Sequence, residues 1–143
     1  MKINVINEQN IKRVSVKKIR DISKYILSKE FKEGPYSLNI LLCDNMRIKE
    51  LNENYRRKEG PTDVLSFAYG LNEPVIGDIV ISVQRIEEQA KDYGNSFEQE
   101  FYYNLIHSLL HILGYDHETS EEDKKHMFEL QDSYFSLLVI QAE

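Results

Sequence analysis

Apolar residues recur along the chain with two different spacings, one typical of helices and one typical of strands. In the N-terminal third, Val16, Ile19, Ile22, Ile26 and Leu27 recur at helical spacing. Elsewhere, short apolar runs bounded by glycine, proline or polar residues are typical of strands. Together these patterns predict strands at Lys2–Ile6, Ser37–Cys43, Val64–Tyr69 and Asp78–Val83, and helices at about Ser15–Phe31, Asp44–Tyr55, Ser82–Tyr93, Ser96–Gly114 and Thr119–Ile140.

The order of these elements defines the expected fold class. Four strands and four or five helices in mixed order indicate an α+β protein, with helices packed on an approximately four-stranded mixed sheet. The chain has 143 residues, a length that suits one domain, and it contains no internal repeat or Pro/Gly linker. We therefore expect residues 1–143 to form a single domain, in which the helix that begins at Ser96 is central.

Composition narrows the class of protein further. The sequence is 41% hydrophobic and 29% charged, as in soluble globular proteins. Neither a signal-peptide pattern nor an apolar run of about 18 residues is present, so we expect no membrane association. Cys43 is the one cysteine and lies in an apolar run, which favours a buried, inert thiol and a reducing, cytoplasmic location.

Charge is unevenly distributed along the chain. Residues 1–58 contain 14 Lys/Arg and 7 Asp/Glu, a balance of +7, whereas residues 59–143 have a balance of −13. The net charge of −6 argues against general nucleic-acid binding. The basic half is either an anion-binding patch or an ordinary solvated surface, and the charge pattern alone does not decide between them.

The most specific chemical signal is a cluster of three histidines in residues 107–117, HSLLHILGYDH. On a helix, His107 and His111 share a face one turn apart and can direct two imidazoles at one point. Gly114 can end that helix in a left-handed conformation, and the returning chain can then supply His117. Three protein ligands with one open position are typical of a catalytic zinc ion, although nickel, copper and iron also bind imidazole.

The residue after the first histidine decides between two kinds of hydrolase. The spacing equals that of the metzincin proteases, H-E-x-x-H-x-x-G-x-x-H, but Ser108 stands where those enzymes have their glutamate base. The site therefore looks hydrolytic without the standard peptidase base. Asp116 can either orient a ligand histidine or cap the turn, and His126 is interpreted as an ordinary structural or exposed residue.

Three segments together resemble the YbeY family of bacterial rRNA-maturation endoribonucleases. The histidine cluster is similar to that family's H-G-x-L-H-L-x-G-Y-D-H, LNENYRRKEGPTDVLSFAYG at 51–70 to L-N-x-x-Y-R-x-K-D-x-P-T-D-V-L-S-F, and GDIVIS at 77–82 to L-G-D-I-x-I-S. The chain departs from the family pattern at Ser108 (commonly Gly), Ala68 (commonly Pro) and Glu59 (commonly Asp). None of these changes removes an expected ligand.

The resemblance implies a function and a set of site residues. It implies zinc bound by His107, His111 and His117, catalytic roles for Arg56 and His111, and ribosomal RNA and the small subunit as partners, with no DNA substrate. Arginine beside a metal suits phosphate chemistry, because guanidinium binds phosphate oxygens bidentately. The implied activity is single-strand-specific endoribonuclease action in 16S rRNA 3′-end maturation and ribosome quality control. A metzincin-like zinc peptidase and a non-catalytic assembly factor with a structural metal remain alternatives.

Overall fold

The computed structural model describes residues 1–55, 62–116 and 118–143. Within these residues a four-stranded sheet has the spatial order β1-β2-β4-β3, formed by β1 (Lys2–Asn7), β2 (Ser37–Cys43), β3 (Val64–Ala68) and β4 (Val75–Ser82). β1, β2 and β4 are parallel, and β3 lies antiparallel to β4 at one edge. The expected mixed sheet and α+β class are confirmed.

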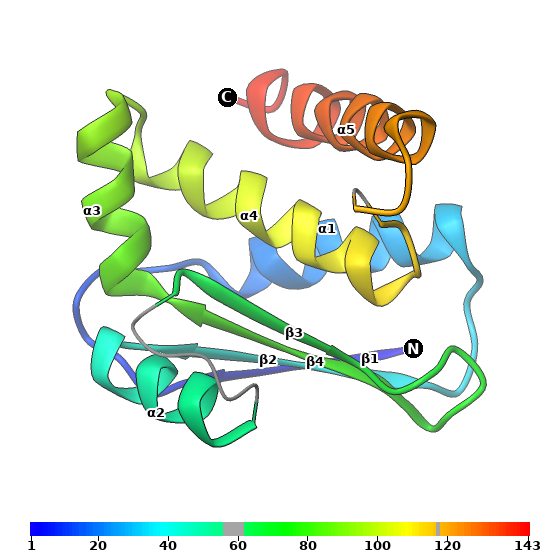
Figure 1. Cartoon of the computed structure of the whole chain (residues 1–143), viewed down its shortest axis with the longest axis horizontal. Helices are drawn as coiled ribbons and strands as arrows, with labels where there is room; N and C mark the ends of the chain where they lie inside the picture. Colours follow the sequence, from blue (N-terminus) through cyan, green and yellow to red (C-terminus); the bar gives the residue numbers. More distant parts are fainter. Residues whose placement is uncertain (56–61, 117) are drawn as a thin grey trace.

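Helices pack on both faces of this sheet (Figure 1). α1 (Val16–Glu30) and α4 (Phe97–Ile112) lie on one face, and α2 (Asn45–Tyr55) lies on the other. α3 (Val83–Tyr93) follows β4 directly and contacts α4 at one end of the sheet. α5 (Glu121–Phe135) packs on α4, so α4 lies between the sheet and α5. The expected central position of this helix is confirmed.

Side-chain caps explain where the helices begin. In each capped helix the residue before the first turn accepts a hydrogen bond from the backbone N–H three residues later, which satisfies one of the free donors at a helix start. The capping residues are Ser15, Asp44, Ser82, Ser96 and Ser120. The first four are the positions at which the sequence predicted helix starts, and Ser120 lies one residue after the predicted Thr119.

Two elements differ from their predicted extent by three residues or more. β4 begins at Val75, three residues before the predicted Asp78, because the parallel pairing with β2 extends to Ser37 through a register shift. The last helix was predicted to be continuous to Ile140. Its α-helical part ends at Phe135, and a short π-helix (Ser136–Ile140) continues it. The side-chain pattern does not distinguish these two kinds of helical turn.

The main hydrophobic core lies between the sheet and the layer of α1 and α4, and a smaller cluster lies under α2. Cys43 belongs to the smaller cluster and is fully buried, and burial raises the pKa of its thiol to about 12. The prediction that this thiol is buried is confirmed. No helix in the described part of the chain is long and apolar enough to cross a membrane.

Candidate metal centre and cleft

Two of the three predicted histidine ligands are brought together on the same face of α4. The Nε2 atoms of His107 and His111 are 3.1 Å apart, and their rings are nearly perpendicular, at 81°. Two imidazole nitrogens about 2.0–2.1 Å from one zinc ion at a tetrahedral angle are separated by about 3.3 Å. The pair therefore has the separation that two ligands of a single ion require.

The end of α4 has the geometry that the sequence predicted from Gly114. This glycine has a φ of +99°, a conformation that L side chains rarely adopt. Its N–H donates to the carbonyl of His111, and the next N–H, that of Tyr115, donates to Leu110. This pair of bonds is a Schellman motif, which turns the chain sharply after the second histidine.

His117, the third predicted ligand, lies outside the described residues. Among residues 1–55, 62–116 and 118–143 there is no group of three histidine, cysteine or acidic side chains arranged to hold a metal ion. The predicted three-histidine site consequently remains a prediction, and the structure describes two of its members. Arg56 and its neighbours Arg57, Lys58 and Glu59 also lie outside the described residues.

Ser108 is positioned as a structural residue of α4. Its side chain is buried, and its hydroxyl donates to the carbonyl of Asn104 at 2.9 Å. This bond back to the preceding turn occupies the hydroxyl proton within the helix. The hydroxyl is thus held by the helix at the position where a metzincin has its glutamate.

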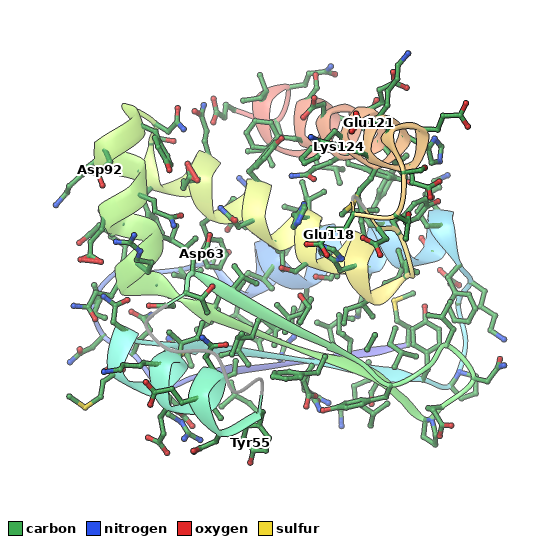
Figure 2. All side chains as sticks on the ribbon, in the orientation of Figure 1. Tyr55, Asp63, Asp92, Glu118, Glu121 and Lys124 are labelled. Atoms are coloured by element: carbon green, nitrogen blue, oxygen red, sulfur yellow. The ribbon has the colours of Figure 1, made fainter. Side chains whose placement is uncertain are left out.

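A cleft of about 620 Å³ separates α4 from the edge strand β3. The two histidines and Ser108 line one wall, and Val64, Ser66 and Ala68 of β3 line the other. The titratable side chains of its described lining are the two histidines, Tyr115 and three carboxylates, Asp63, Asp116 and Glu118, without a lysine or arginine. Figure 2 shows Asp63 near the start of β3 and Glu118 near the C-terminal end of α4.

Asp116 makes the turn-capping contact that was one of its two predicted roles. Its Oδ1 accepts a hydrogen bond from the backbone N–H of Glu118 at 2.8 Å. His126 lies on the exposed side of α5, where its ring is 5.7 Å from that of Tyr115. The interpretation of His126 as a structural or exposed residue agrees with this position.

Several residues of other elements that contact His107 or the segment after α4 were not predicted from the sequence. Oε1 of Gln131, in α5, lies 2.8 Å from Nδ1 of His107 and can only accept a hydrogen bond from it, and Phe128 stacks on the same imidazole. Glu30, at the end of α1, accepts hydrogen bonds from the hydroxyls of Tyr115 and Tyr134. One signal was present in the sequence: Gln131 is a polar residue in line with Met127 and Tyr134, at a position that helical spacing assigns to the core.

The fold and the cleft together define a class of protein. It is a small α+β protein with a mixed sheet. Its central helix carries two histidines, spaced as metal ligands are, that line a cleft beside the edge strand of the sheet. The family model described as Endoribonuclease YbeY matches residues 3–139. The chain belongs to this family.

Individual relatives agree with that assignment along nearly the whole chain. An Endoribonuclease YbeY from Petrotoga mobilis is 63% identical over 139 residues, which cover 97% of this chain and 96% of that protein. One from Fusobacterium nucleatum is 44% identical, covering 95% of this chain and 85% of that protein. The solution structure of TM1509 from Thermotoga maritima superposes with a TM-score of 0.72 at 33% identity, covering 95% of this chain and 88% of that one.

Proposed function

We propose that this protein is a single-strand-specific, metal-dependent endoribonuclease. In this proposal it acts in 16S rRNA 3′-end maturation and ribosome quality control in the cytoplasm, with ribosomal RNA and the small subunit as partners. The observation that carries the proposal is the convergence of the His107 and His111 Nε2 atoms, 3.1 Å apart, in a chain of the Endoribonuclease YbeY family.

The donor set suits zinc as the resident ion. His107 and His111 would hold it with His117 as the third ligand, and three nitrogen ligands leave one position for water or substrate. When bound, the ion would act as a Lewis acid that stabilises negative charge on a phosphate group. The carboxylates that line the cleft, Asp63 and Asp116 among them, make a cation especially important for admitting a polyanionic strand.

Arg56 would supply the second positive group. Its guanidinium would bind nonbridging oxygens of the scissile phosphate, where charge develops during cleavage, and Arg57 and Lys58 would extend the contact along the RNA backbone. Ser108 makes a peptidase mechanism of the metzincin type less favourable, because its hydroxyl is bonded to Asn104 and an unperturbed hydroxyl is no general base.

The proposal predicts that single substitutions strongly reduce or abolish cleavage without unfolding the protein. Purified protein, assayed for metal content and on single-stranded and duplex rRNA precursors, should cleave the single strands, and chelation should stop cleavage. Arg56→Ala should reduce the rate by about 10²- to 10³-fold, the usual effect of removing a group that stabilises transition-state charge. His111→Ala should lose both the metal and the activity.

Matched controls and contrary outcomes distinguish the alternatives. His126→Ala replaces an exposed side chain of α5, and Arg85→Ala replaces a partly exposed side chain of α3 that pairs with Glu88; both should retain full activity. A folded, zinc-loaded protein that leaves RNA intact would contradict the proposal. Cleavage of peptides by the same preparation would support the peptidase, and ribosome-assembly function retained in Arg56→Ala would support the non-catalytic factor.

A further inference from the structure

A buried polar side chain of α5, Gln131, lies in the contact between α5 and α4. Met127, Gln131 and Tyr134 recur at i, i+4 and i+7 and form the buried residues of α5. Gln131 is 1% exposed. An amide in this position has to be hydrogen-bonded, because an unpaired buried polar group costs about 1–3 kcal/mol.

The amide of Gln131 is only partly satisfied. Its Oε1 lies 2.8 Å from Nδ1 of His107, whereas its Nε2 has no hydrogen-bond partner among the described residues. Packing alone would be served better by leucine or methionine, which bury no donor. A glutamine at this position therefore indicates that its amide oxygen has a role, one that offsets the free-energy cost of the unpaired amide nitrogen.

The bond between Gln131 and His107 determines where the imidazole proton lies. An amide oxygen only accepts, so this hydrogen bond requires the imidazole proton to be on Nδ1 of His107. In a neutral imidazole the lone pair is then on Nε2, the atom that faces Nε2 of His111 at 3.1 Å. This is the tautomer that a metal ligand bound through Nε2 requires.

A second residue of α5 restricts the orientation of the same ring. Phe128, three residues before Gln131, stacks on His107 with ring centroids 6.1 Å apart and an interplanar angle of 29°. Gln131 thus contacts the edge of the imidazole and Phe128 contacts its face. Both contacts come from α5, which lies on the far side of α4 from the sheet (Figure 1).

We propose that Gln131 is a positioning residue, which holds His107 in the Nδ1–H tautomer and directs its Nε2 toward the point shared with His111. The expected effect of Gln131 on metal affinity rests on the proposed function, because that effect concerns the same histidine site. The expected effect of Gln131 on the tautomer of His107 concerns the metal-free protein and does not depend on that function.

The first experiment measures zinc affinity by competition with a chromophoric chelator. Gln131→Met keeps a similar side-chain volume and removes the amide oxygen, so zinc binding should weaken by about 10- to 100-fold, as for other residues that orient a metal-bound histidine. Gln131→Glu keeps an oxygen that accepts from Nδ1 and should restore most of the affinity. Met127→Leu, a change one turn away in the same buried stripe, should bind zinc like the wild type.

Urea unfolding of the metal-free proteins separates positioning from stability. Gln131→Met should be as stable as the wild type or more stable, because it removes the unpaired amide nitrogen. Weakened zinc binding accompanied by an equal loss of metal-free stability would indicate a structural role and overturn the inference. Unchanged zinc affinity in Gln131→Met would also overturn it.

The second experiment observes the tautomer directly in metal-free protein. At about pH 8, above the ordinary histidine pKa of about 6.5, long-range ¹H–¹⁵N spectra should show His107 protonated at Nδ1 in the wild type and in Gln131→Glu. Gln131→Met should show a mixture or the Nε2–H form. If the wild type binds no zinc but its His107 tautomer still depends on residue 131, the proposed function fails and the positioning role stands. If His107 of the wild type is protonated at Nε2 instead of Nδ1, the positioning role itself is refuted.

Discussion

Gly77 shows how one missing side chain allows the histidine helix to approach the sheet. A Cβ atom added at Gly77 would lie 2.6 Å from Cδ1 of Ile112, near the C-terminal end of α4, and 2.7 Å from the backbone carbonyl oxygen of Phe67 in β3. The Ile112 side chain can rotate away, but the carbonyl belongs to the β3–β4 ladder and cannot move without breaking it. We therefore expect Gly77→Ala to lower the free energy of unfolding by about 1–3 kcal/mol, as overpacked cores do.

Gly34 provides the matched control for that substitution. A Cβ atom there would have its nearest contact at 3.8 Å, with Cδ1 of Tyr36. Gly34→Ala should thus be neutral or stabilise by up to about 1 kcal/mol, since it reduces the freedom of the unfolded chain. Urea unfolding of both variants measures the difference, and equal stabilities would refute the close approach at Gly77.

At the residue scale, the sequence predicts which side chains can bind a metal better than it predicts which residues of other helices contact them. The spacing of His107 and His111 is enough to predict that their rings converge, because both lie on one helix. It cannot show that Gln131, 24 positions away from His107, contacts the same imidazole. That contact depends on how α5 packs on α4, which is a long-range property of the fold.

At the scale of elements, the register of β3 determines which backbone groups face its free edge. The carbonyl of Asp63 accepts from Ser82, and the N–H of Tyr69 donates to Ile76. Because antiparallel ladders alternate, the N–H groups of Leu65 and Phe67 also point to β4, and that of Ser66 points away from it. Among residues 1–55, 62–116 and 118–143, β3 therefore has one edge bonded to β4 and one edge without a partner strand, and it lines the cleft.

Proline substitutions test this alternation. Ser66→Pro removes an outward N–H and should be tolerated, as proline is at the free side of edge strands. Phe67→Pro removes an N–H that bonds to β4, and it should lower the free energy of unfolding by about 1–3 kcal/mol more than Phe67→Ala, which controls for the lost ring. Urea unfolding measures these values. If Ser66→Pro were the more damaging proline variant, the deduced register would be wrong.

Element boundaries were predictable where a local signal exists. Serine and aspartate caps mark the helix starts, and the predicted Ser37–Cys43 strand is β2 without any change of bounds. The start of β4 at Val75 depends instead on its pairing with β2, and the last helix changes to π-helical turns at Ser136. Neither leaves a periodic pattern in the local sequence.

At the scale of the whole molecule, buried and hydrogen-bonded tyrosines link helices that are distant in sequence. The hydroxyls of Tyr115 and Tyr134 both donate to Glu30, which joins the end of α1, the segment after α4, and α5. Hydrogen bonding to Glu30 and burial raise the pKa of Tyr115 to about 12, and burial together with the same carboxylate raises that of Tyr134. Burial likewise raises the pKa of Tyr102 and Tyr103 to about 12.

These shifts predict that the protein loses stability in alkaline solution. The folded state disfavours tyrosinate, so the unfolded chain releases these protons first, at its ordinary pKa of about 10. The stabilisation is therefore complete below about pH 10 and is lost as the pH rises toward about 12. Urea unfolding at a series of pH values measures this slope, and the ultraviolet absorbance of tyrosinate follows the ionisation itself.

A double variant, Tyr115→Phe with Tyr134→Phe, isolates the contribution of the cluster around Glu30. It should be less stable than the wild type at neutral pH, because both hydrogen bonds to the carboxylate are lost, and its stability should fall less steeply above about pH 10, because two shifted groups are gone. Tyr93→Phe, at an exposed tyrosine of α3, should leave both properties unchanged. An unchanged alkaline slope in the double variant would show that Glu30 and its two tyrosines do not couple the three helices in this way.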